Sequence, residues 1–266
     1  MAFVAVNGVR LNYSETGTGE PVLLIMGSGA SGRAWHLHQV PALVAAGFRV
    51  ITFDNRGIPP SEPGNGPYTI HDLVADTAGL IEALRLGPCR VVGTSMGAQV
   101  AQELATARPD LVTRLVLMAT RGRTDRFRAA LRRAEAELYD AEAKVPPAYT
   151  AMVQALQNLS PATQADDQAM ADWLELFELT APSGPGYRAQ LEVDAIPERL
   201  DAYRAITAPC RVIAFADDVI CPPHLGREVA DAIPGADFVV VPRCGHYGYL
   251  EDPERVNDSI IELLSR

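Results

Sequence analysis

Short apolar runs rich in β-branched residues recur along the chain, and longer segments with helical periodicity separate them. A continuous apolar run is typical of a strand that is buried on both faces, as in a parallel sheet. The alternation of such runs with helices predicts an α/β fold: a mostly parallel central sheet with helices on both faces. The predicted buried strands are 21–26, 48–54, 90–92, 114–118, 211–216 and 238–242.

The amino-terminal segment has a different pattern. Asn7-Gly8 separates two short runs, 3–6 and 9–13. Asn-Gly is the strongest two-residue signal for a β-hairpin, because both central residues of a type I′ turn need a positive φ. The sheet is therefore predicted to begin with an antiparallel pair of strands.

Helices are predicted between the strands. Apolar residues between Ile70 and Leu84 recur three or four positions apart, which places them on one face of a helix. Gly87-Pro88 is expected to stop this helical segment. The other segments with helical character are 33–46, 95–107, 224–233 and 253–264, the last with Pro253 in its first turn.

Residues 121–208 interrupt this rhythm. They contain no strand pattern and are rich in Ala, Leu, Glu and Arg, with prolines between short helical stretches. We therefore expect one α/β domain, formed by residues 1–120 and 209–266, with a helical insertion at 121–208. Six arginines between 121 and 133 precede a run of acidic residues. They are expected either to form ion pairs on a solvated helix or to steer an anionic substrate.

Composition narrows the class of function. The 266 residues include 23 basic and 33 acidic side chains, for a net charge of −10. Such an acidic chain is not expected to bind nucleic acid, which requires a basic surface. No apolar run reaches the roughly 18 residues of a membrane span, and the amino terminus lacks the pattern of a secretion signal. We therefore expect a cytoplasmic protein that acts on a small molecule without membrane contact, and the sequence leaves its oligomeric state open.

Four cysteines stand at 89, 210, 221 and 244. They form no C-x-x-C pair and have no histidine at the spacing of a zinc site, so we expect free thiols and no metal. Cys221 and Cys244 flank candidate functional loops, where they are either inert buried thiols or a redox-sensitive pair.

The sharpest chemical signal is Gly93-Thr94-Ser95-Met96-Gly97, a G-x-S-x-G motif between a predicted strand and a predicted helix. A nucleophile on such a tight turn needs small neighbours two residues away on each side. The amino terminus of the following helix also favours developing negative charge. Ser95 is therefore the candidate nucleophile.

A serine hydroxyl needs a base within hydrogen-bonding reach to become a good nucleophile. His246 follows the last predicted strand, where its loop would lie at the same sheet edge as Ser95. The other four histidines, at 36, 38, 71 and 224, lie in or beside helical segments and are expected to be surface or packing residues. His246 is thus the candidate base.

A carboxylate is needed to orient the imidazole and to stabilise its cation. Asp217 and Asp218 both follow the predicted strand 211–216. We favour Asp218, which stands four residues before the turn proline Pro222, and keep Asp217 as the alternative. The order Ser, Asp, His along the chain is that of α/β hydrolases and not that of chymotrypsin or subtilisin.

These motifs, from the hairpin to the histidine loop, resemble the α/β-hydrolase fold family over essentially the whole chain. The resemblance implies a Ser95–His246–Asp218 triad, with the oxyanion held by the backbone N–H groups of Met96 and Ser28. It also implies a helical cap at 121–208 and a mechanism that needs no cofactor or metal. The candidate pocket residues are Gly27, Trp35 and Tyr247.

Two positions depart from many relatives. Met26-Gly27 stands where they have His-Gly, and Arg56-Gly57-Ile58-Pro59-Pro60-Ser61 stands where they have R-G-x-G-x-S. Because the oxyanion donors are backbone groups, we expect the first change to alter substrate preference rather than to abolish activity. Proline fixes φ and removes a donor, so the second loop is expected to be stiffer.

Ser95 separates this chain from the haloalkane dehalogenases and epoxide hydrolases of the family, which need a carboxylate at that position. Esterases, lactonases, C–C bond hydrolases, thioesterases and cofactor-free haloperoxidases or perhydrolases remain. Tyr68-Thr69-Ile70 is similar to enol-lactonases, whereas Gly27-Ser28-Gly29 and Trp35 are somewhat similar to C–C hydrolases. We expect a hydrolase of a small or medium ester, lactone or thioester. The alternatives are a C–C hydrolase or a cyclase or lyase with the same triad, and a binding protein without turnover.

Overall fold

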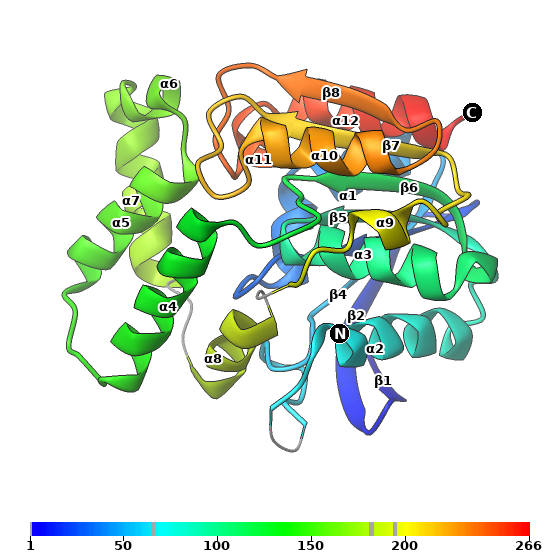
Figure 1. Cartoon of the computed structure of the whole chain (residues 1–266), viewed down its shortest axis with the longest axis horizontal. Helices are drawn as coiled ribbons and strands as arrows, with labels where there is room; N and C mark the ends of the chain where they lie inside the picture. Colours follow the sequence, from blue (N-terminus) through cyan, green and yellow to red (C-terminus); the bar gives the residue numbers. More distant parts are fainter. Residues whose placement is uncertain (1, 65–66, 181–183, 194–195) are drawn as a thin grey trace.

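The computed structural model describes residues 2–64, 67–180, 184–193 and 196–266. Eight strands form one sheet in the order β1-β2-β4-β3-β5-β6-β7-β8 (Figure 1). The first two pairings, β1 with β2 and β2 with β4, are antiparallel, and all others are parallel. The strands are β1 (Ala2–Val6), β2 (Val9–Thr16), β3 (Pro21–Ile25), β4 (Arg49–Phe53), β5 (Cys89–Thr94), β6 (Val112–Met118), β7 (Cys210–Phe215) and β8 (Asp237–Val241).

The predicted α/β class and the six predicted buried strands are confirmed, with strand ends that differ by one or two residues. The predicted hairpin is also present. Asn7 and Gly8 have φ values of 44° and 77°, as a type I′ turn requires. The strands and the hairpin could therefore be predicted from local sequence signals.

Helices cover both faces of the sheet. Successive side chains of a strand point to opposite faces, and the apolar side chains on each face are buried against helices. Leu23 and Ile25 of β3 pack with α2 (Ile70–Ala83) and α3 (Met96–Ala107) on one face, whereas Val22 and Leu24 pack with α1 (Gln39–Ala45) and α12 (Pro253–Leu264) on the other. The helices outside the insertion, with two 3₁₀ turns, are η1 (Gly32–Leu37), α1 (Gln39–Ala45), α2 (Ile70–Ala83), α3 (Met96–Ala107), η2 (Pro109–Leu111), α10 (Pro223–Ala232), α11 (Gly248–Glu251) and α12 (Pro253–Leu264).

One helix prediction was wrong in detail. Residues 33–46 do not form a single helix, because η1 and α1 meet at His38, whose φ of −140° is not helical. Pro41 explains the break: it lacks an N–H and is tolerated only in the first turn of a helix, so a helix begins just before it rather than running through it. The short helix α11 was not predicted.

The described part of residues 121–208 is helical and contains no strand. Proline stands at the start of α5 and α6, where its missing N–H costs nothing. In Figure 1 these helices lie to one side of the sheet. We call α4 to α8 the insertion helices: α4 (Arg126–Asp140), α5 (Pro147–Asn158), α6 (Pro161–Gln164), α7 (Asp167–Thr180) and α8 (Gly184–Val193); α9 (Leu200–Tyr203) leads back to the sheet.

The insertion contacts the rest of the molecule at two sites, one at α8 and one at the start of α6. Tyr68 on the loop before α2 donates to the Gly186 carbonyl of α8. Glu251 of α11 accepts from the Ser160 N–H at 2.8 Å and from the Gly245 N–H at 2.6 Å. Among the helices of the described ranges, none combines the length and the apolar character that crossing a membrane requires.

Candidate active site

Ser95 lies on a sharp turn between β5 and α3. Its φ of 54° and ψ of −123° are strained for a residue with a side chain. The turn is possible because its neighbours are glycines: a Cβ on Gly93 would lie 2.3 Å from the Gly97 carbonyl oxygen, and a Cβ on Gly97 would lie 2.2 Å from that of Ile25. The spacing of the motif therefore follows from backbone packing, and it presents the Ser95 hydroxyl at the carboxyl edge of the sheet.

His246 and Asp218 lie beside Ser95, as the sequence predicted. The Ser95 hydroxyl lies 3.0 Å from His246 Nε2, and His246 Nδ1 lies 2.8 Å from an Asp218 carboxylate oxygen. The second oxygen of Asp218 accepts the backbone N–H groups of Ile220 and Cys221, both at 2.8 Å. Asp218 and His246 are 3% and 5% exposed, so water screens their interaction weakly. This chain of hydrogen bonds can move a proton from Oγ to Nε2 while Nδ1 stays bonded to the carboxylate.

The other candidates for the acid and the base take no part in this chain of hydrogen bonds. Asp217 is half-buried, and its backbone N–H donates to the Cys244 carbonyl. The other four histidines are all exposed, namely His36, His38, His71 and His224.

The loop after β3 carries one predicted oxyanion donor, Ser28, and lies against the turn that carries the other, Met96. A Cβ on Gly27 would be 3.1 Å from the Ser95 Cβ, so a larger residue would require the loop or the Ser95 turn to shift by a few tenths of an ångström. Both Ser28 and Ser95 line the same cavity. The backbone is thus arranged around the space beside the Ser95 hydroxyl.

A residue that the sequence did not indicate holds this loop in place. Gln190 of α8 is fully buried; its amide oxygen accepts the Gly29 N–H at 2.7 Å and its amide nitrogen donates to the Arg56 carbonyl at 3.2 Å. Asn55 supports the loop from the other side by donating to the Met26 carbonyl. A lone glutamine in a helix carries no motif, so no sequence signal could have found it.

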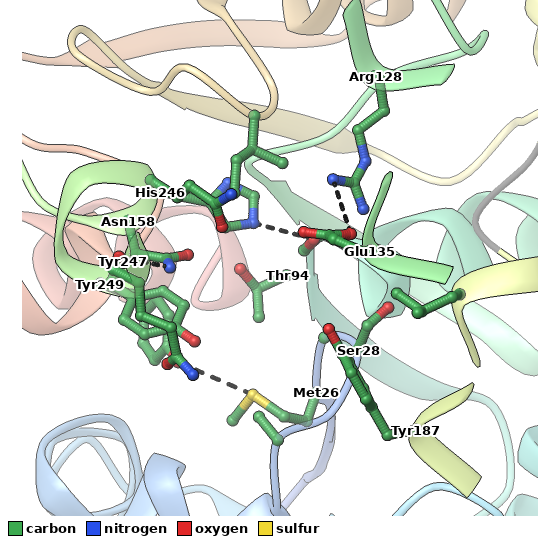
Figure 2. A pocket seen from close by; sticks show the side chains of 17 residues that line it. Met26, Ser28, Thr94, Arg128, Glu135, Asn158, Tyr187, His246, Tyr247 and Tyr249 are labelled. Carbon is green, nitrogen blue, oxygen red and sulfur yellow. Dashed lines mark hydrogen bonds and ion pairs between the residues drawn. The ribbon is translucent and has the colours of Figure 1, made fainter. Parts of the chain in front are cut away.

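The cavity beside Ser95 has a volume of about 110 Å³. Figure 2 shows His246 on one side of it and Ser28 with Tyr187 on the other, while Arg128 and Glu135 reach in from α4. Arg128 lies 3.8 Å from Glu135 and is 7% exposed. The insertion therefore supplies part of the wall. The lining residues are Met26, Gly27, Ser28, Ala30, Thr94, Ser95, Arg128, Glu135, Gln154, Gln157, Asn158, Tyr187, Leu191, Ile220, His246, Tyr247 and Tyr249.

Of the three predicted pocket residues, Gly27 and Tyr247 line this cavity, but Trp35 does not. Trp35 is fully buried behind the wall, where its ring packs on Tyr249 at 5.1 Å between centroids. The Tyr249 hydroxyl donates to the Met26 sulfur at 3.8 Å. Burial raises the pKa of Tyr247 to about 12, so this phenol stays neutral at physiological pH.

One cluster in the described ranges has the donor types of a metal site: Asp218, Cys221 and His246, with ligand atoms within 4.8 Å of one another. Both Asp218 oxygens already accept hydrogen bonds within the protein, one of them from His246. We therefore assign the cluster to hydrogen bonding. All four cysteines are buried and free, and burial raises the pKa of Cys244 to about 12, which keeps this thiol protonated.

Comparison with known proteins gives a consistent picture. A sequence model described as "Alpha/beta hydrolase family" matches residues 22–259. The chain is 51% identical over 258 residues to a Mycobacterium tuberculosis protein named "Putative non-heme bromoperoxidase BpoC", with 97% of this chain and 98% of the relative covered. The crystal structure under that name has a TM-score of 0.93 and 50% identity, and the match covers 96% of this chain and 95% of that one.

Two further relatives carry the names of hydrolases. A 2-hydroxy-6-oxononadienedioate/2-hydroxy-6-oxononatrienedioate hydrolase of Burkholderia vietnamiensis is 31% identical over 272 residues, covering 97% of this chain and 92% of the relative. A thermophilic esterase from Thermogutta terrifontis, solved with malate bound, has a TM-score of 0.86 and 30% identity, covering 100% of this chain and 98% of that one.

Proposed function

The chain belongs to the alpha/beta hydrolase family, and from this premise we propose that it cleaves a carboxylic ester, lactone or thioester through an acyl-enzyme on Ser95. One observation carries the proposal: the unbroken chain of hydrogen bonds from the Ser95 hydroxyl through His246 to the buried Asp218 carboxylate. Similarity to an esterase structure at 30% identity supports the same reaction.

In this mechanism His246 first acts as a base. Its Nε2 takes the hydroxyl proton as Ser95 Oγ attacks the carbonyl carbon, and Asp218 stabilises the imidazolium that forms. His246 then gives the proton to the leaving alcohol or thiol, and the acyl group stays on Ser95. Water deprotonated by His246 attacks this acyl-enzyme and releases the acid. These steps need no cofactor or metal.

The remaining parts of the site have supporting roles. The Ser28 and Met96 N–H groups are the proposed donors to the tetrahedral oxyanion, and removing one such donor in a protease costs about 2.7–4 kcal/mol of transition-state stabilisation. The insertion helices act as a cap that restricts water and selects substrate size. Four free cysteines suit a reducing compartment such as the cytoplasm.

The nucleophile can be tested directly. We expect intact-mass analysis after treatment with a fluorophosphonate to show one adduct on the wild type and none on Ser95→Ala. His246→Ala should react far more slowly, because its serine lacks a base. A folded wild-type protein that forms no adduct would contradict the proposal and favour a binding protein without turnover.

A second candidate function is hydrolysis of a C–C bond with the same triad. It is favoured by the 31% identity to the Burkholderia vietnamiensis protein, which is named a 2-hydroxy-6-oxononadienedioate/2-hydroxy-6-oxononatrienedioate hydrolase. A panel of p-nitrophenyl esters, lactones, thioesters and 2-hydroxy-6-oxo dienoates separates the two, since a C–C hydrolase should turn over esters weakly. The name of the Mycobacterium tuberculosis relative adds bromide oxidation with hydrogen peroxide to the panel.

A further inference from the structure

A second and larger cavity lies between α4 and α5. It has a volume of about 440 Å³, against about 110 Å³ for the inner cavity beside Ser95. Its walls are mainly apolar, with Leu131, Ala134 and Leu138 on α4 and Tyr149 and Val153 on α5. We call this cavity the α4–α5 groove.

The apolar residues form one stripe on each helix. Leu131, Ala134 and Leu138 are three and four positions apart, and Tyr149 and Val153 are four apart, so each set lies on one helix face. Leu138 is 49% exposed and Tyr149 is 62% exposed. Two facing stripes of this kind, left open to water, are typical of a binding surface rather than of a solvated helix.

The groove stays open because α4 and α5 each pack against a different helix. Ala151 and Ala155 are fully buried on the opposite side of α5, which packs on α7. By contrast, α4 is tied to α8 by Arg132 with Glu192 at 2.9 Å and by Arg188 with Asp140 at 2.8 Å. The helices α4 and α5 therefore do not pack closely on each other along these stripes.

The groove and the inner cavity share part of their walls. Glu135, Gln154, Gln157 and Tyr187 line both, and we call these four residues the collar. All four have long side chains with several rotamers, and Glu135 also lies 3.8 Å from Arg128. A ligand that filled both cavities would pass between these four side chains.

We propose that the α4–α5 groove binds the apolar alkyl or aryl chain of the substrate while the scissile carbonyl lies at Ser95. The inference rests on the proposed hydrolytic function, which it extends to a substrate class: esters or thioesters with a medium-length apolar chain. Ligand sites usually have volumes of about 300–1,000 Å³. The inner cavity is well below this range, whereas the groove lies within it.

The activity test fills the groove and leaves Ser95 untouched. Ala134→Trp places a large ring between the two stripes. Ala129→Trp, at an exposed position five residues earlier on α4 and on another face of that helix, is the matched control. We expect Ala134→Trp to lower kcat/KM about tenfold or more for p-nitrophenyl octanoate or for octyl acetate, since each methylene in an apolar pocket contributes strongly to discrimination. The loss should be smaller for p-nitrophenyl acetate, which lacks the octanoyl chain, and Ala129→Trp should match the wild type throughout.

A binding test separates this inference from the proposed chemistry. In calorimetry with 1-octanol, the wild type and Ser95→Ala should bind equally, Ala129→Trp should bind like them, and Ala134→Trp should lose binding. If octanol binds in this way but no ester is hydrolysed, the groove stands and the proposed function fails. If Ala134→Trp affects neither long-chain turnover nor octanol binding, the groove is not a substrate site. A wild-type dimer that Ala134→Trp dissociates would show that a second copy covers the stripes, which also overturns the inference.

Discussion

At the residue scale, the site depends on glycines that let backbone segments come into close contact around Ser95. Ser95 keeps a positive φ because glycines stand two residues before and after it, where the strand, the helix and the β3 loop come closest. Any Cβ there meets backbone rather than a flexible side chain. The same contacts fix the distance between the nucleophile and the proposed oxyanion loop.

Gly97→Ala is therefore expected to be severely disruptive. Its Cβ would lie 2.2 Å from the Ile25 carbonyl oxygen and 2.7 Å from that of Met26, so the β3 loop must move. We expect a loss of about 3 kcal/mol or more in the free energy of unfolding, measured by urea denaturation. The control is Gly226→Ala in α10, whose Cβ would have no neighbour nearer than 3.5 Å and should stabilise by up to about 1 kcal/mol. Equal effects of the two changes would contradict this account.

Gln190 is expected to act as a positioning residue for the oxyanion loop. Gln190→Leu leaves the part-buried Gly29 N–H without its acceptor, which costs roughly 1–3 kcal/mol of stability. The Arg56 carbonyl loses the Gln190 amide but keeps the Tyr68 hydroxyl at 3.1 Å. Displacement of the loop should also lower kcat about tenfold or more, with a smaller change in KM.

The conservative variant tests that role. Gln190→Glu keeps an acceptor for Gly29 but cannot donate to Arg56 when ionised. It should therefore retain most of kcat while losing stability. If both variants lower only the melting temperature and leave kcat unchanged, Gln190 is merely structural.

At the element scale, the sequence was most informative where structure is local. The Asn7-Gly8 turn and the apolar strands depend on neighbouring residues, and they were predicted nearly to the residue. The three residues of the hydrogen-bonded chain could be predicted too, because parallel strands bring their carboxyl ends to one edge. Gln190 and the α4–α5 groove could not, since they depend on how helices of the insertion pack against the sheet and against each other. The same holds for Arg121, which is fully buried although its sequence neighbourhood suggested a solvated face.

The last helix shows how such packing can be probed by pH. Arg211 on β7 donates to Glu262 on α12 at 2.9 Å and to Asp237 on β8 at 2.9 Å. These bonds, together with those from Arg266, lower the pKa of Glu262 to about 2. A carboxyl whose pKa is lower in the folded state stabilises the fold above its unfolded value of about 4.3, and this contribution is lost as the pH falls towards the folded value.

We therefore expect Glu262→Gln to lower the melting temperature at pH 7 and to differ less and less from the wild type between pH 4.5 and about 2. Thermal unfolding followed by circular dichroism measures the difference. In an Arg211→Met background the same change should have a smaller effect at pH 7, because Glu262 then keeps only its contact with Arg266. A difference that does not vary with pH would show that the carboxylate charge is not the cause.

At the scale of the whole molecule, the negative net charge predicts that anionic substrates are repelled, whereas the arginines of the insertion predict that they are attracted. The structure pairs Arg123 with Glu228, Arg132 with Glu192 and Arg133 with Glu137. Arg133 with Glu137 is the expected i, i+4 pair on a solvated helix, whereas Arg123 and Arg132 pair with acids on α10 and α8. In all three cases the positive charge is largely offset close by. The net charge of −10 is left to dominate at long range.

This balance should be visible in the salt dependence of turnover. An anionic ester approaches against the net field, so its kcat/KM should rise as salt shortens the screening length to about 8 Å at physiological ionic strength. A neutral ester of similar size is the control and should change little, while a cationic ester should show the opposite trend. If kcat/KM for the anionic ester instead falls with added salt, the arginines near the cavity, Arg128 among them, outweigh the net charge locally. The site would then be one that attracts acidic substrates.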